Sequence, residues 1–172
     1  MNQFQLPHLA LRRALSALCA GMVALALSGC GERTPAPNFP YTLLDGSQAR
    51  TEQMRGKVLL VNFWATTCTV CVQEMPRLVA THQKYQGRGF ETLAVAMNYD
   101  PPARVWDFAM RRGLPFGVVI DNTGAIARSF ADVPGTPTTF LIDKKGAIVK
   151  RFVGEPDFAE LHTLVDQLLA EA

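Results

Sequence analysis

Two cysteines separated by two residues, Cys68 and Cys71, are the clearest candidates for chemistry in this sequence of 172 residues. Two thiols this close together can be oxidised to a disulfide, and they can exchange it with a disulfide of another protein. The thiolate is the nucleophile in that exchange. The chemistry therefore depends on surroundings that ionise one of the two sulfurs near neutral pH.

The pair lies where a strand is expected to lead into a helix. Residues 57–63 are mostly aliphatic and aromatic, as in a buried strand, and a helical pattern runs from about 71 to 85. The first turn of a helix presents unpaired N–H groups and a partial positive charge, which stabilise a thiolate at Cys68. Cys71, about one turn further on, can then attack the mixed disulfide that Cys68 forms with a partner.

Strands and helices alternate along the rest of the chain. We expect strands at 41–44, 57–63, 90–97 and 117–121, helices at 71–85, 101–113 and 125–130, a hairpin from 138–143 and 147–153, and a helix at 156–170. With 48% hydrophobic and 19% charged residues, the chain can fill one core. The order predicts a single α/β domain whose mixed sheet is covered on both faces and has an antiparallel edge.

Some finer assignments follow from composition and periodicity. Residues 47–55 are polar and are expected to form a connection with room for one helical turn. Apolar spacing assigns Trp106 to the core side of the helix at 101–113. In the helix at 71–85, the residues spaced to form one buried face are Met75, Leu78, Val79 and His82.

The first thirty residues have the proportions of an export signal. Arg12 and Arg13 precede the apolar run 14–27, which is shorter than the roughly 20 residues of a membrane-spanning helix. The run ends in Leu-Ser-Gly-Cys at 27–30, which resembles the bacterial lipoprotein signal and implies that Cys30 is acylated and becomes the N-terminus. We therefore expect a signal peptide at 1–29, a lipidated cysteine and proline-rich tether at 30–40, and a domain at 41–172; an uncleaved anchor is the alternative.

Charge and cysteine usage follow from this division. Without Arg12 and Arg13, 15 of the 17 basic residues remain against 15 acidic ones, so the mature chain is near neutral and nothing indicates a nucleic-acid partner. Cys19 leaves with the signal and Cys30 goes to lipid, so the mature domain keeps one free pair. That pair closes too short a loop to stabilise much structure, which favours a working disulfide.

Taken together, four motifs resemble the thioredoxin superfamily and, within it, the TlpA/ResA group of membrane-tethered thiol-disulfide oxidoreductases. They are Phe-Trp-Ala at 63–65, the cysteine motif at 68–71, Pro76 in the following helix, and Gly-Thr-Pro-Thr at 135–138. The resemblance implies a thioredoxin-like fold with an N-terminal β extension and an inserted helix and strand at 101–121. It also implies a cis bond before Pro137, facing the disulfide.

The same resemblance suggests which residues contact a client. The backbone of Thr136, turned outward at a cis Pro137, could pair with an extended client segment as a strand does. Trp64 either shields the thiolate from water or packs in the core. We therefore expect Trp64, Thr136 and Pro137 to bind substrate.

Asn62 and Glu74 distinguish this chain from ordinary thioredoxins. Asn62 stands where those proteins carry a buried aspartate, whereas Glu74 resembles a glutamate that the TlpA/ResA group keeps in its active site. Glu74 is therefore expected to be the acid and base that moves the proton of Cys71. The alternative is a carboxylate in the first helical turn, placed there by the helix dipole. Thr67 and the Thr69-Val70 pair match no common pattern, which leaves redox potential and partner choice open.

The resemblance implies a reductase of protein disulfides, fed by a membrane electron donor, with apocytochrome c or copper-site assembly proteins as clients. No nucleotide or flavin motif appears in the chain, so neither cofactor is expected. No metal site is expected either, because a closed zinc site needs about four ligands and the chain has no second cysteine or histidine pair. The alternatives are a peroxiredoxin-like peroxidase and a non-enzymatic copper-binding or assembly module. The peroxidase is disfavoured because Ala65 occupies the place of its usual threonine or serine.

Overall fold

The computed structural model describes residues 33–131 and 133–171. The predicted signal peptide and Cys30 lie outside the described residues. The described elements, in chain order, are β1 (Pro40–Thr42), β2 (Gln48–Arg50), the 3-10 helix η2 (Thr51–Met54), β3 (Val58–Trp64), α2 (Thr69–Tyr85), β4 (Phe90–Ala96), α3 (Pro102–Arg112), β5 (Gly117–Ile120), α4 (Ala125–Ser129), β6 (Thr138–Ile142), β7 (Ile148–Val153) and α5 (Phe158–Ala170).

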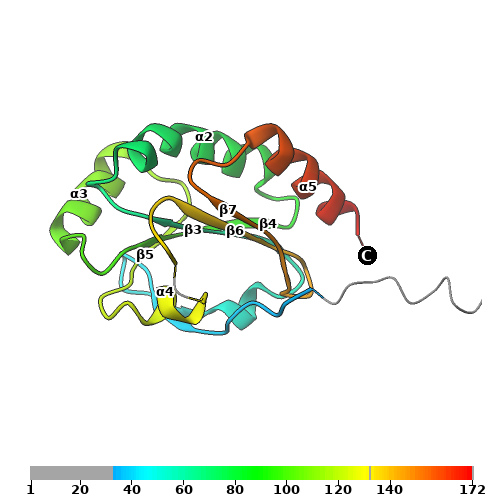
Figure 1. The fold of residues 1–172 in the computed structure, drawn as a ribbon, viewed down its shortest axis with the longest axis horizontal. Helices are drawn as coiled ribbons and strands as arrows, with labels where there is room; N and C mark the ends of the chain where they lie inside the picture. Colours follow the sequence, from blue (N-terminus) through cyan, green and yellow to red (C-terminus); the bar gives the residue numbers. More distant parts are fainter. Residues whose placement is uncertain (1–32, 132, 172) are drawn as a thin grey trace, which may run out of the picture. The chain divides into compact units, whose positions relative to one another are not determined.

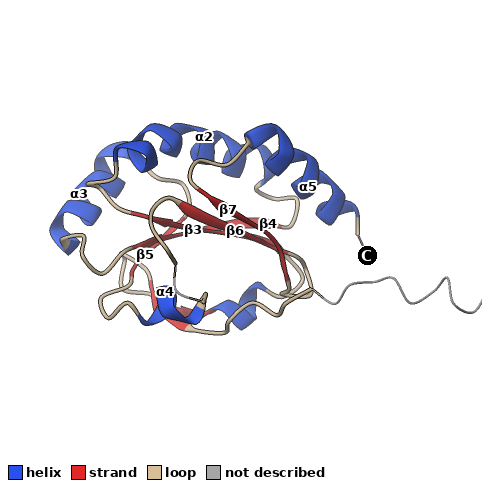
Figure 2. Ribbon diagram, viewed as in Figure 1, coloured by secondary structure: helices blue, strands red, loops and turns tan. Residues whose placement is uncertain are grey.

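The central sheet is drawn in red between the helices in Figure 2. It has five strands in the order β5-β4-β3-β6-β7. Strands β3, β4 and β5 are parallel, whereas β6 runs antiparallel to β3 and β7 antiparallel to β6. The expected mixed sheet with an antiparallel edge is confirmed, and so is the helix and strand unit α3-β5 inserted after β4. This topology brings the carboxyl ends of β3 and β4 and the start of β6 to the same end of the sheet.

Both faces of the sheet are covered (Figure 1). Alternate residues of β3 point to opposite faces, as strand geometry requires. Val58, Leu60 and Trp64 pack with apolar residues of α2, α3 and α5, whereas Leu59, Val61 and Phe63 pack with α4 and the N-terminal segment. Asn62 shares the face of Leu60 and Trp64, so its amide lies under α2 in an otherwise apolar layer.

The predicted polar connection at 47–55 instead contains a strand. After a turn at Gly46, whose φ is +85°, β2 pairs antiparallel with β1, and η2 provides the expected helical turn. An antiparallel bridge between Leu43 and Val119 joins this small hairpin to β5. Three paired residues give too weak a hydrophobic alternation to be recognised from sequence, so this strand was missed.

The part of the predicted tether that the structure describes, residues 33–40, is packed onto the domain. Pro35 forms an antiparallel bridge with Ala147, and the N–H of Ala36 donates to the carbonyl of Gly146 at 2.9 Å. Phe39 is buried, 6% exposed. Residues 33–40 thus pack as part of the domain that was predicted to start at 41, because a proline-rich extended segment can still line a sheet edge and bury an aromatic side chain.

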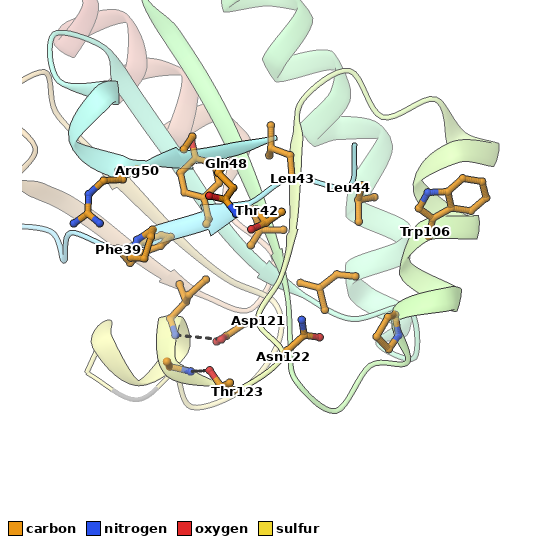
Figure 3. Close-up of a pocket in the computed structure, with 18 of the residues that line it drawn as sticks. Phe39, Thr42, Leu43, Leu44, Gln48, Arg50, Trp106, Asp121, Asn122 and Thr123 are labelled. Carbon is orange, nitrogen blue, oxygen red and sulfur yellow. Dashed lines mark hydrogen bonds between the residues drawn. The ribbon is translucent and has the colours of Figure 1, made fainter. Parts of the chain in front are cut away.

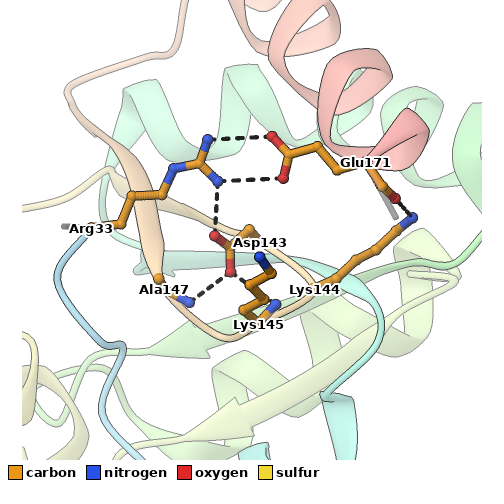
Figure 4. A network of polar contacts seen from close by, with 6 residues as sticks. All are labelled: Arg33, Asp143, Lys144, Lys145, Ala147 and Glu171. Atoms are coloured by element: carbon orange, nitrogen blue, oxygen red, sulfur yellow. Dashed lines mark hydrogen bonds and ion pairs between the residues drawn. The ribbon is translucent and has the colours of Figure 1, made fainter. Parts of the chain in front are cut away.

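A group of ion pairs holds the start of this segment (Figure 4). The guanidinium of Arg33 donates to Asp143 at 2.9 Å and pairs with Glu171 at 3.3 Å. Asp143 also accepts the N–H groups of Lys145 and Ala147 in the β6–β7 turn. The chain therefore enters the domain beside that turn, at the sheet edge opposite the cysteine pair.

Among residues 33–131 and 133–171, none of the helices is both long and apolar enough to cross a membrane.

Candidate active site

Cys68 is the N-cap of α2, and its sulfur lies at the first turn of that helix. The N–H of Cys71 donates to Cys68 Sγ at 3.1 Å, and the helix begins at Thr69, two residues before the expected start. Cys68 and Cys71 form a disulfide. Because this N–H and the positive end of the helix dipole both face Cys68 Sγ, they stabilise negative charge there when the pair is reduced.

The two sulfurs differ in exposure. Cys71 is completely buried, whereas Cys68 is half-buried at the surface. A partner disulfide can therefore approach Cys68, and Cys71 can act only on a sulfur already joined to Cys68. The geometry thus distinguishes an accessible sulfur, that of Cys68, from an enclosed one, that of Cys71.

The segment before β6 lies directly against Cys68. The Thr136–Pro137 peptide bond is cis, as the resemblance implied, and the carbonyl oxygen of Thr136 lies 3.5 Å from Cys68 Sγ. The N–H of Gly154 donates to the carbonyl of Pro137 at 2.8 Å, which ties the β7–α5 loop to this segment. Tyr99, 57% exposed, has its hydroxyl 3.2 Å from Thr136 Oγ1. Tyr99 was missed because nothing in its local sequence marks it.

Trp64 does not reach the surface in this structure. Its side chain is completely buried, and the indole packs against Phe108 with ring centroids 5.1 Å apart. Its Nε1 has no hydrogen-bond partner among the described residues. Contrary to the expected role in substrate binding, Trp64 is not accessible to a client and acts here as a packing residue behind the cysteine pair.

Glu74 is fully buried on the inner face of α2, one turn after Cys71. Its Oε1 accepts from Asn62 Nδ2 at 3.0 Å, and the same amide nitrogen donates to Thr139 Oγ1 at 3.0 Å. Its Oε2 has no partner among the described residues. The alternative of a carboxylate placed in the first helical turn by the helix dipole is wrong, because α2 begins at Thr69 and has no acidic residue in its first turn.

Burial raises the pKa of Glu74 to about 7, and the hydrogen bond from Asn62 opposes part of that rise. The carboxyl group therefore changes charge near neutral pH. Residues three apart on a helix lie on the same face, so Glu74 and Cys71 share one buried region. Such a group can hold a proton at pH 6 and release it at pH 8.

Asp100 supports the loop that precedes Cys68. This buried carboxylate follows β4 and accepts from the hydroxyl of Thr66 at 2.6 Å and from its backbone N–H. A polar residue just after a parallel strand is a recognisable signal for an active-site edge, and it could have been used for Asp100. The role of Thr139 could not be predicted from the residues around it, because Thr139 contacts Asn62 only through the pairing of β3 with β6.

A separate groove of about 1060 Å³ lies between the N-terminal hairpin, the start of α3 and the end of β5 (Figure 3). Trp106 lines it and is 53% exposed, so its assignment to the core is wrong. The buried face of α3 is made by Val105 and Ala109. Asp121, also in the groove, accepts the N–H groups of Ile126 and Ala127 and thereby caps α4.

No group of three or more His, Cys, Asp or Glu side chains suited to holding a metal ion occurs within the described ranges 33–131 and 133–171.

The sequence model of the Redoxin family matches residues 31–168. The chain belongs to the Redoxin family. Its fold and cysteine pair are those of the thioredoxin superfamily, and the chain is similar to thiol-disulfide oxidoreductases named ResA.

Among curated relatives of this Redoxin chain, the thiol-disulfide oxidoreductase ResA of Geobacillus thermodenitrificans is 40% identical over 99 residues, 58% of this chain and 56% of that protein. ResA of Bacillus anthracis is 37% identical over 99 residues, 58% and 57% of the two chains. The matched part thus spans little more than half the length of these relatives. A thioredoxin-family thiol:disulfide interchange protein from Chlorobium tepidum superposes with a TM-score of 0.74 at 29% identity, covering 81% of this chain and 99% of that one.

Replacing Glu74 with Gln should change how stability depends on pH. The pKa of Glu74 is raised from 4.5 to about 7, so the folded state binds its proton more tightly than the unfolded state. This contribution is fully present below pH 4.5 and is lost as pH rises to 7, a decline of roughly 3 kcal/mol for this one group. We expect urea unfolding of the oxidised protein to show that decline, and Glu74→Gln to remove it.

The exposed Glu160, replaced by Gln, is the matched control and should leave the decline unchanged. Identical pH dependence in the wild type and Glu74→Gln would show that Glu74 is not protonated in the folded protein at pH 6.

Proposed function

We propose that this protein is a thiol-disulfide oxidoreductase that reduces disulfides of client proteins. The thiolate of Cys68 attacks one sulfur of the client disulfide, forming a mixed disulfide and releasing one client thiolate. The thiolate of Cys71 then attacks Cys68 Sγ, forming the Cys68–Cys71 disulfide and releasing the second client thiolate, which takes up a proton. Two electrons pass from the cysteine pair to the client. The observation that carries the proposal is the N–H of Cys71 directed at Cys68 Sγ at a helix start.

The backbone of Thr136 at the cis bond to Pro137, whose side chain is buried, is proposed to receive the client. The Thr136 carbonyl is 3.5 Å from the attacking sulfur, and Thr136 is half-buried at the rim of the site. An extended client segment that pairs with this backbone would bring its own cysteine to Cys68. Tyr99, joined to Thr136 through its hydroxyl, adds an exposed aromatic surface beside that segment.

The proposed setting is the outer face of a membrane. Cys30, acylated, would anchor the chain, and a membrane donor would re-reduce Cys68 and Cys71. Clients would be disulfide-bearing proteins such as apocytochrome c or copper-site assembly proteins, as the TlpA/ResA resemblance implies. A chain anchored at Cys30 would enter the domain at Arg33, which lies at the end of the sheet opposite Cys68. The disulfide would therefore stay open to clients.

Glu74 is proposed to take the proton of the Cys71 thiol before the second attack. We expect Glu74→Gln to slow insulin reduction at pH 7 and to flatten the pH dependence of the rate between pH 5 and 8, because Gln cannot accept that proton. The rate is followed by insulin precipitation with dithiothreitol as reductant. An unaltered pH–rate profile would remove Glu74 from the reaction.

The two cysteines should behave differently on substitution. Cys68→Ser is expected to abolish insulin reduction, whereas Cys71→Ser should accumulate mixed disulfides through Cys68, visible as adducts on non-reducing gels and in mass spectra. Insulin reduction that survives in Cys68→Ser would exclude the proposed chemistry. Hydrogen peroxide consumption by the reduced wild type would support the peroxidase alternative instead.

Cys30 is expected to be the acylated N-terminus of the mature protein. Mass spectrometry of full-length protein expressed in a bacterium and purified from membranes should show cleavage after Gly29 and acyl chains on Cys30, and Cys30→Ser should prevent both. More than one chain is expected, because each buried methylene contributes about 0.8 kcal/mol and one chain binds only reversibly. A mature chain that starts elsewhere, or an unmodified Cys30, would disprove the anchor.

A further inference from the structure

The β4–α3 turn, residues 97–100, lies against the end of the strand that leads to the cysteine pair. The N–H of Met97 donates to the carbonyl of Trp64 at 3.0 Å, and the N–H of Asp100 donates to the carbonyl of Met97 at 3.0 Å. These bonds fix the turn to β3. Two neighbouring side chains of the turn, those of Tyr99 and Asp100, then contact two different segments of the site.

Asp100 holds the segment on one side of the reactive sulfur. Its buried carboxylate accepts the backbone N–H of Thr66 and, at 2.6 Å, the Thr66 hydroxyl. Thr66 lies inside the turn that follows β3, which is closed by the N–H of Cys68 donating to the carbonyl of Ala65 at 3.2 Å. Two hydrogen bonds thus hold this turn from within, and the place of Cys68 at the helix start depends on them.

Tyr99 holds the segment on the other side of the sulfur. Its hydroxyl is 3.2 Å from Thr136 Oγ1, and the carbonyl oxygen of the same threonine is 3.5 Å from Cys68 Sγ. The contact joins residues 37 positions apart. Because Thr136 belongs to the segment proposed to pair with a client, the Tyr99 hydroxyl bears on where that backbone lies relative to the sulfur.

We propose that Tyr99 and Asp100 are positioning residues that together set the spacing between Cys68 Sγ and the Thr136 backbone. Adjacent residues of one turn hold the two segments that flank the sulfur, so the segments cannot move apart without breaking a hydrogen bond. The role of Tyr99 rests on the proposed function, because only a client would pair with Thr136. The role of Asp100 in placing Cys68 does not.

The two residues should affect different reactions. A small disulfide needs only the sulfur, whereas a client protein needs the sulfur and the strand-like pairing beside it. Loss of the Tyr99 hydroxyl frees the Thr136 segment and should weaken the reaction with the client alone. Loss of the Asp100 contact displaces Cys68 and should slow both reactions. A purely structural role would lower stability and leave the reactivity of the folded protein unchanged.

The test compares insulin, with dithiothreitol as reductant, and glutathione disulfide as substrates of the full-length chain. Glutathione disulfide takes two electrons from the reduced pair, which gives the Cys68–Cys71 disulfide and two glutathione thiols. That oxidation is followed by mass spectrometry of the tryptic peptide that carries both cysteines. Urea unfolding of each oxidised variant reports its stability separately.

Tyr99→Phe removes the hydroxyl and keeps the aromatic ring. We expect the KM for insulin to rise about fivefold with kcat little changed, as for loss of one neutral hydrogen bond that contributes to binding. The rate with glutathione disulfide should stay at the wild-type value. Tyr85→Phe, which removes a hydroxyl bound to His162 and Asp166, is the matched control and should alter neither reaction. An unchanged KM for insulin, or an equal loss with glutathione disulfide, would overturn the role of Tyr99.

Asp100→Asn and Thr66→Val break the other contact from its two ends. We expect Asp100→Asn to slow both reactions about tenfold, as for loss of one hydrogen bond to a charged group, and Thr66→Val to slow both in the same direction. The double variant should lose less than the product of the two single factors, because both changes break one contact. If Asp100 acted through its charge, Asp100→Asn would favour the Cys68 thiolate and speed both reactions. That result, or factors that multiply, would overturn the proposal.

Asp107→Asn makes the same substitution on the exposed side of α3, where the carboxylate accepts from Arg111 Nε at 2.7 Å, and should leave both rates in place. Should Asp100→Asn fail to fold, Thr66→Val decides alone, and an unchanged rate in it overturns the role of Asp100. Slower oxidation of Thr66→Val by glutathione disulfide in a protein that does not reduce insulin would sustain that role and remove the proposed function. Insulin reduction that none of these variants alters would do the reverse.

Discussion

The N–H of Cys71 directed at the sulfur of Cys68 is the interaction on which the rest of the site depends. A helix start offers unpaired donors and a partial positive charge, and here both are aimed at a sulfur that a partner can reach. Strand β3 delivers the chain to this point, and the Thr136–Pro137 segment closes over it. Sheet, helix and loop thus combine to present one reactive atom.

Behind Cys68 Sγ, the carboxyl group of Glu74 is buried in the core. A buried carboxyl group is costly unless it is neutral or hydrogen-bonded. Asn62 supplies one hydrogen bond to Glu74, and burial keeps the proton on the acid up to about pH 7. Asn62 itself is held by Thr139 on the adjacent strand. The arrangement keeps a group that changes charge near neutral pH in the same buried region as Cys71.

Most of the fold could be predicted from local pattern. Long runs such as β3 and the helix after the cysteines have clear periodicity, and their boundaries differ from prediction by one or two residues. The prediction failed mainly for short elements and for a helix with apolar residues on more than one side. Strand β2 has only three residues. Trp106 lies on a helix with several apolar residues, and the helical spacing alone does not show which of them pack against the rest of the domain. Residues 33–40 were predicted to be part of a tether, because a proline-rich composition does not show that a segment packs along the edge of a sheet.

The sequence by itself determined the fold class, the cysteine pair at a strand-to-helix junction, and the candidacy of Glu74 and Pro137, because these rest on spacing within a few residues or on motifs. Only the tertiary structure decided that Trp64 is enclosed, that Asn62 and Thr139 hold Glu74, and that Tyr99 meets Thr136. Those contacts join residues from 12 to 77 positions apart. The register of the sheet and the packing of the β4–α3 turn against the segment before β6 bring them together, and neither leaves a local trace in the chain.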